Sequence, residues 1–203
     1  GRRRGRRSGR FLILGSASID LLRQSGESLA GRISYIEMGP LSALEVPESD
    51  PSGLGSHTRL WLRGGFPEAY LAETDRKSLQ RRKNFIRTYL ERDVPQFGPR
   101  IPAETLERLW VMLAHSQGTP LNASKLAASL AVSVQSVTRY IDLLSDLLLV
   151  RRLRPYHTNT SKRLVKSPKI YVRDSGLTHA LLGIPDYDAL LGHPVAGMSW
   201  KGS

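Results

Sequence analysis

The chain has 203 residues, 40% hydrophobic and 24% charged, a balance typical of a folded protein with an apolar core. Thirty Lys and Arg against eighteen Asp and Glu give a formal net charge of +12, which favours a polyanionic partner. The absence of cysteine excludes disulfides and thiolate metal sites and predicts a reducing, cytoplasmic setting, and no apolar run reaches the roughly 18 residues of a membrane span.

The N-terminal part predicts a basic tail followed by strands. Six arginines stand within residues 1–10. Residues 11–14 form a continuous apolar run, typical of a strand buried on both faces, and end in small polar residues. A second strand is predicted over 32–38. Because two strands do not make a stable parallel sheet with covered faces, we expect residues 11–56 to lie within a fold that begins upstream.

Residues 57–97 predict a helical unit, with helices over 60–73 and 78–93. In the second helix the apolar face contains Phe85, Ile86, Tyr89 and Leu90, and the periodicity places the basic residues mostly outward: Arg81, Arg82, Lys83, Arg87 and Arg92. Residues 65–67, Gly-Phe-Pro, predict a tight turn that opens a helix. The Gly and Pro residues of 97–102 then predict a domain boundary.

Residues 98–155 predict three helices followed by a short basic hairpin, the pattern of a winged helix-turn-helix. Asn122 is expected to begin the second helix, and Ser133 is expected to cap the third. Apolar residues recur along the third helix at steps of three and four: Val134, Val137, Ile141, Leu144 and Leu148. This stripe predicts the buried face of a recognition helix.

The opposite face of that helix predicts a DNA-reading surface. It carries side chains that can reach base edges in a major groove: Gln135, Ser136, Thr138 and Arg139. The predicted wing adds Arg151, Arg152 and Arg154, within a segment, 151–173, that has eight Lys and Arg and no acidic residue. Many winged helices dock proteins instead, so DNA and a protein partner both remain open.

The last segment, 156–203, offers little chemistry. A strand over 169–173 leads to Asp174, which we interpret as the N-cap of a helix reaching about residue 182. The five histidines lack metal-ligand spacing, and no nucleophile elbow is present, so we predict neither a metal site nor covalent catalysis.

Several motifs resemble, in order, the second half of the AAA-like ATPases of bacteria and archaea that carry a C-terminal domain of unknown function. They lie at residues 15–18, 27–32, 40–42, 62–68, 88–93 and 166–177. The resemblance implies a mixed α/β, mainly helical fold. Its expected parts are a partial AAA-like ATPase half with its lid, a winged helix-turn-helix, and the start of a restriction-endonuclease-like domain.

The resemblance also implies nucleotide-sensing residues. Ser16 falls at the sensor position near the γ-phosphate, and Arg32 at a phosphate-sensing arginine. Gly65 and Pro67 match the turn that packs a lid on adenine. The alternatives from residue type alone are a strand-end or helix-cap serine at Ser16, a strand-end surface arginine at Arg32 and a tight turn at residues 65–67 that opens a helix.

The phosphate loop G-x-x-x-x-G-K-[ST] does not occur in the chain, nor does an apolar strand ending in paired acids that would hold Mg²⁺. We therefore expect ATP and Mg²⁺ only in the complete protein, with no cofactor and no ATP hydrolysis for this chain alone. The leading hypothesis is a fragment of an AAA-like ATP-binding protein that couples nucleotide state to the basic winged helix on DNA or a partner. The alternative is a stand-alone DNA-binding or protein-interaction adaptor without catalysis.

Overall fold

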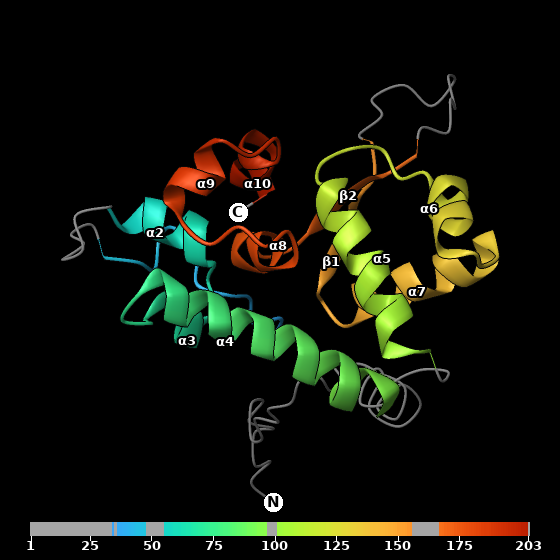
Figure 1. Ribbon diagram of the computed structural model, residues 1–203, viewed down its shortest axis with the longest axis horizontal. Coiled ribbons are helices and arrows are strands. Elements are labelled where there is room, and N and C mark those ends of the chain that lie inside the picture. The colour runs from blue at the N-terminus through green and yellow to red at the C-terminus, as the bar shows by residue number, and fades with distance from the viewer. Residues whose placement is uncertain (1–33, 35, 48–54, 97–100, 156–166, 203) are drawn as a thin grey trace, which may run out of the picture.

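Figure 1 shows the computed structural model, which describes residues 34, 36–47, 55–96, 101–155 and 167–202. Two groups of helices lie on either side of α8 (Ser175–Leu181). The predicted strand at 11–14 lies outside the described residues, and so do Ser16 and Arg32. Within the described part the fold is mainly helical with a small sheet, as predicted. None of its helices is long and apolar enough to cross a membrane.

The first group begins with three helices: α2 (Ser56–Arg63), α3 (Pro67–Tyr70) and α4 (Asp75–Thr88). The helix predicted over 60–73 is broken because Gly64 adopts φ +78°, which a helix cannot continue through. Pro67 occupies the first turn of α3, where its missing N–H costs nothing. α4 starts at the side-chain cap of Thr74 and runs on as a π-helical turn, Tyr89–Asp93, and a 3-10 turn, Val94–Gln96.

The second group contains three helices and a two-stranded sheet: α5 (Ala103–His115), α6 (Ala123–Leu130), α7 (Val134–Asp146), β1 (Val150–Leu153) and β2 (Lys169–Val172). The predicted start of α6 at Asn122 and the predicted cap Ser133 are confirmed, since Asn122 accepts from the Lys125 N–H at 2.9 Å and Ser133 from the Ser136 N–H at 3.0 Å. The middle of the predicted stripe is fully buried, but Val134 at its start is 46% exposed.

The two strands are antiparallel, with Val150 opposite Val172 and Leu153 opposite Lys169. The segment between α5 and α6 extends the sheet, because Gly118 N–H donates to Ile170 O at 2.7 Å and Leu121 N–H donates to Pro168 O at 2.8 Å. Residues 118–121 therefore run along the free edge of β2.

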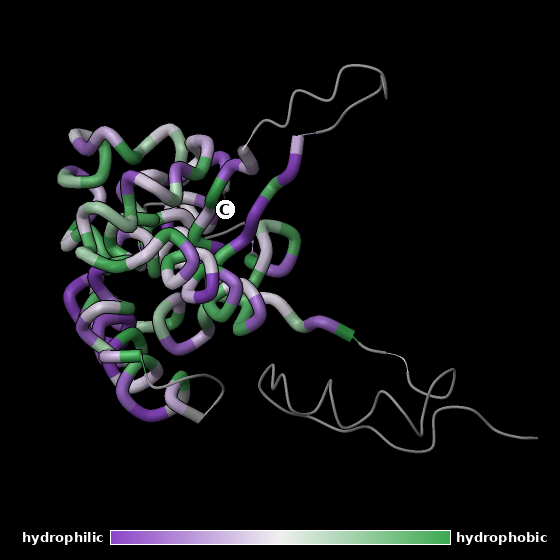
Figure 2. The backbone as a smooth tube through the Cα atoms, turned by 90° about the vertical axis from the view of Figure 1, so that its right-hand side faces the viewer, coloured by the Kyte–Doolittle hydropathy of each residue, from purple (hydrophilic) through white to green (hydrophobic). Residues whose placement is uncertain are grey.

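The remaining helices are α9 (Tyr187–Leu191) and α10 (Ala196–Gly202). The main apolar core continues from the end of α4 through α5, α6, α7 and both strands to Leu177 and Ala180 of α8. A second, smaller core is built by α2 and the C-terminal helices: Trp61, Leu62, Ile184, Leu190 and Val195. Figure 2 shows hydrophobic and hydrophilic positions alternating along the tube, as expected for amphipathic helices that share a core. Because α8 packs against α2, α4 and α5, it joins the two groups.

Candidate functional site

Gly64 and Gly65 follow α2 and form what we call the glycine turn. This turn packs against the start of α8 with no space between them. A Cβ on Gly64 would lie 2.2 Å from Asp174 Oδ1, and a Cβ on Gly176 would lie 2.1 Å from the Arg63 carbonyl oxygen. Real Cβ atoms do not approach other atoms so closely. The Arg-Gly-Gly and Asp-Ser-Gly motifs, more than a hundred residues apart in the chain, are thus two halves of one contact.

Asp174 holds this contact together. Its Oδ2 accepts the Gly65 N–H at 2.7 Å, and its Oδ1 accepts the Leu177 N–H at 2.8 Å. The second bond confirms the predicted N-cap of α8. Burial raises the pKa of the Asp174 carboxyl, while the two N–H donors and the nearby Arg82 cation favour the ionised form. One carboxylate therefore ties the glycine turn to α8.

Arg82 is the second buried charge of the contact, only 1% exposed. Its Nη1 donates to Gly176 O at 2.8 Å and to Leu62 O at 3.1 Å, so α4 is bound to both α8 and the end of α2. Burial lowers the pKa of Arg82 to about 10, and the residue stays cationic near neutral pH. The prediction that this arginine points outward is wrong. Arg82 lies four residues from Ser78 and four from Ile86, both buried on α4, and this spacing was the sequence signal that it lies on the buried face of the helix.

A cavity of about 680 Å³ lies beside the glycine turn. It is bounded by residues 40–44, by α2 and by the start of α8, with Gly65 and Asp174 in its wall and Trp61 and Trp200 on the α2 and α10 side. Leu41 N–H donates to Gly65 O at 2.8 Å and so fixes the 40–44 segment to the turn. Of the predicted nucleotide-sensing residues, Gly65 lines this cavity.

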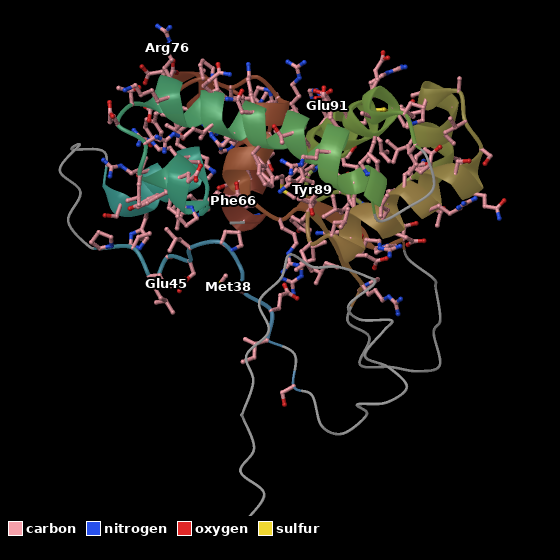
Figure 3. The ribbon with its side chains drawn as sticks, turned by 90° about the horizontal axis from the view of Figure 1, so that it is seen from below. Met38, Glu45, Phe66, Arg76, Tyr89 and Glu91 are labelled. Carbon is pink, nitrogen blue, oxygen red and sulfur yellow. The ribbon has the colours of Figure 1, made fainter. Side chains whose placement is uncertain are left out.

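Pro67 lies apart from the cavity wall, exposed on α3. Phe66, between Gly65 and Pro67, turns toward α4, where its ring centroid is 4.9 Å from that of Phe85. Phe85 in turn stacks on Tyr89 at 5.3 Å. In Figure 3, Phe66 and Tyr89 lie along the inner side of α4, whereas Arg76 projects into solvent. The turn is therefore anchored by a row of aromatic rings.

The predicted DNA-reading residues of α7 differ in how exposed their side chains are. Gln135, Thr138 and Arg139 are exposed, whereas Ser136 is half-buried. The Ser136 hydroxyl lies 2.9 Å from that of Ser133, and the Thr138 hydroxyl donates to Val134 O at 3.0 Å. Both hydroxyls are thus engaged within the helix, which leaves Gln135 and Arg139 as its long outward polar side chains near the start.

The predicted wing arginines lie on and just after β1. Arg151, Arg152 and Arg154 are all exposed by residue. Arg152 differs from the others, because its Nη2 forms an ion pair with Asp142 Oδ1 of α7 at 2.7 Å. The structure brings these arginines to the same helical group as Arg139, far along the chain from the glycine turn.

Sequence reasoning also missed His179 and Gln117. His179 is fully buried on α8, between Leu62 O and the Ser199 hydroxyl, both 3.1 Å away. The Gln117 amide bonds both the N–H and the C=O of Val172 and so continues the sheet by a side chain. No local pattern marks either role. Among the described residues no group of three His, Asp or Glu could hold a metal ion.

Comparison with known families gives two matches along the chain. Residues 56–188 match the domain of unknown function DUF8612, and residues 2–46 match the AAA domain. The predicted combination of an AAA-like N-terminal segment and a domain of unknown function is thereby confirmed.

Two curated relatives are uncharacterized proteins, Mb2031c of Mycobacterium bovis and Rv2008c of Mycobacterium tuberculosis. Each is 48% identical over 193 residues, which cover 95% of this chain and 42% of the relative. The chain thus spans less than half the length of the curated relatives it matches. No solved structure matches it.

Proposed function

The chain belongs to the family of the domain of unknown function DUF8612, and on this premise we propose that it is the lid and output part of an AAA-like ATP-binding protein. In the complete protein, ATP with Mg²⁺ would set the position of the glycine turn, and α8 would pass that position to a basic winged helix on DNA. The observation that carries this proposal is the buried bond between Gly65 and Asp174.

This bond supports coupling because it joins the expected nucleotide contact to the expected DNA-binding unit. Gly65 lines the cavity, and its N–H donates to Asp174, which lines the same cavity. Asp174 caps α8, whose Leu177 packs in the same core as α5 and α7. Since no space separates the glycine turn from α8, the turn cannot shift without moving α8 or breaking a buried hydrogen bond.

A winged helix is supported by the order of its elements. Helix α5, the edge segment 118–121, helices α6 and α7, and strands β1 and β2 follow one another as in that fold. Gln135 and Arg139 on α7 would contact base edges, and Arg151 and Arg154 would contact phosphates.

Salt-dependent binding to a random-sequence duplex tests the DNA part with the 203-residue chain. The logarithm of affinity should fall linearly with log salt, by about 0.9 per phosphate contact. Arg151→Gln and Arg154→Gln should each reduce that slope by about one. Lys83→Gln is the matched control, because it removes an exposed cation from α4 and should leave the slope unchanged. A flat salt response would remove DNA binding from the proposal.

The nucleotide part is tested separately. In the complete protein, ATP should change DNA affinity, and Asp174→Asn should abolish that change while ATP still binds. The 203-residue chain by itself should not hydrolyse ATP, since it has no phosphate loop. Hydrolysis by this chain that is lost in Arg32→Ala would overturn the argument.

The alternative, an adaptor that docks a protein without catalysis, has one observation in its favour. Val134 and Leu153 are apolar yet 46% and 47% exposed, and they flank the basic residues of α7 and β1. Apolar side chains in such a position favour a protein partner. A flat salt response with loss of partner binding in Leu153→Ser would select this function.

A further inference from the structure

Of the two aspartates of α7, Asp142 lies nearer to the proposed DNA-reading residues. Asp142 lies one helical turn after Thr138 and Arg139, at spacings of four and three residues, and therefore on the same side of the helix. Its side chain is 45% exposed. A free carboxylate there would repel the phosphates that Arg139 is proposed to approach.

Arg152 neutralises the negative charge of Asp142. Its Nη2 lies 2.7 Å from Asp142 Oδ1, and its side chain is 35% exposed. The pair joins α7 to β1, the first strand of the sheet.

Strand geometry gives an independent reason for this role. Successive side chains of β1 point to opposite faces of the sheet. Arg152 shares its face with Val150, which is 2% exposed and belongs to the core, whereas Arg151 and Leu153 point the other way. Arg152 thus leaves the strand on the helix side, toward α7. Arg151 leaves it on the open side.

We propose that Arg152 is a positioning residue and not a phosphate contact: its ion pair neutralises Asp142 beside Arg139 and holds the hairpin against the recognition helix. This inference rests on the proposed DNA binding and assigns the arginines different roles. Arg151 and Arg154 contact phosphates and contribute to the salt slope, while Arg152 raises the DNA affinity of the α7 surface by neutralising Asp142.

The test measures DNA affinity and its salt slope for Arg152→Gln with the 203-residue chain and a random-sequence duplex. Arg152→Gln should bind about five-fold more weakly at low salt, because the uncovered carboxylate repels DNA, and its slope should change by clearly less than the one unit expected for a lost phosphate contact. Adding Asp142→Asn should restore affinity, since the repelling charge is then gone. The matched control Arg151→Gln should lower the slope by about one, and Asp142→Asn should not rescue it.

Each result decides the inference. A slope reduced by about one in Arg152→Gln, with no rescue by Asp142→Asn, would make Arg152 a phosphate contact and overturn the positioning role. Because both partners are partly exposed, the variants should unfold at nearly the wild-type denaturant concentration, which excludes misfolding as the cause. Absence of salt-dependent binding in the wild-type chain would instead refute the proposed DNA binding itself, and the inference with it.

Discussion

Lowering the pH from 7 to 5 should destabilise the protein through His179. The Nδ1 atom lies 3.1 Å from the Leu62 carbonyl oxygen, which can only accept, so Nδ1 carries the ring proton. Nε2 then accepts from the Ser199 hydroxyl at 3.1 Å, and that hydroxyl oxygen accepts the Trp61 indole N–H at 2.9 Å. The neutral ring thus completes a chain of hydrogen bonds linking α2, α8 and α10.

Burial is the main reason why the charged ring is disfavoured, with smaller contributions from the charges of Arg82 and His193 opposing the Leu62 bond. Together they lower the pKa of His179 from 6.5 to about 4. In the unfolded chain His179 is therefore protonated below about pH 6.5, whereas in the folded protein it is protonated only below about pH 4. The stability contribution is complete above pH 6.5 and is lost as the pH falls toward 4. Linkage gives a loss of about 2 kcal/mol between pH 7 and 5.

The assay is urea unfolding at several pH values for the wild-type chain and His179→Asn. The asparagine amide can still donate to Leu62 O, and the Ser199 hydroxyl can donate to the Ala196 carbonyl oxygen, from which it already lies 3.0 Å. Because other titrating groups are common to both proteins, the difference between their unfolding free energies isolates His179. That difference should shrink by about 2 kcal/mol from pH 7 to 5. His115→Asn, at an exposed position of α5, is the control. A difference that stays constant with pH would refute the reasoning.

Three further predictions concern the contact between the glycine turn and α8. Gly64→Ala should lower the unfolding free energy by more than about 2 kcal/mol, because the residue has a positive φ and the new Cβ would collide with Asp174. Gly183→Ala should lower it by only about 1 kcal/mol, because Gly183 has φ +71° but open space around it. Thermal unfolding of the two variants measures this difference. Arg82→Met should cost about 3 kcal/mol in urea unfolding, because it leaves the Leu62 and Gly176 carbonyl oxygens without their donor and removes the cation near the buried Asp174 carboxylate. Adding Asp174→Asn should recover part of that loss, and a double variant no more stable than Arg82→Met would show that the two charges are not coupled.

Local features of the fold followed from neighbouring residues. Ser133 and Asp174 were predicted as caps and Asn122 as the start of a helix, and each of the three side chains accepts from an N–H three residues further along the chain. The buried centre of α7 followed from its spacing, since one helical face returns every three or four residues. Both signals are contained within about one turn of chain, where backbone geometry alone decides which atoms meet.

Tertiary structure decided the features that connect distant segments. Arg82 was interpreted as exposed among basic neighbours, but the carbonyl groups of Leu62 and Gly176 give it a buried place. The sequence suggested a turn at Gly65, yet not that its N–H meets Asp174. Three arginines near β1 looked alike, and the Asp142 carboxylate separated Arg152 from the other two. Which groups meet across such distances depends on how helices pack, and packing uses the shapes and charges of all of them at once.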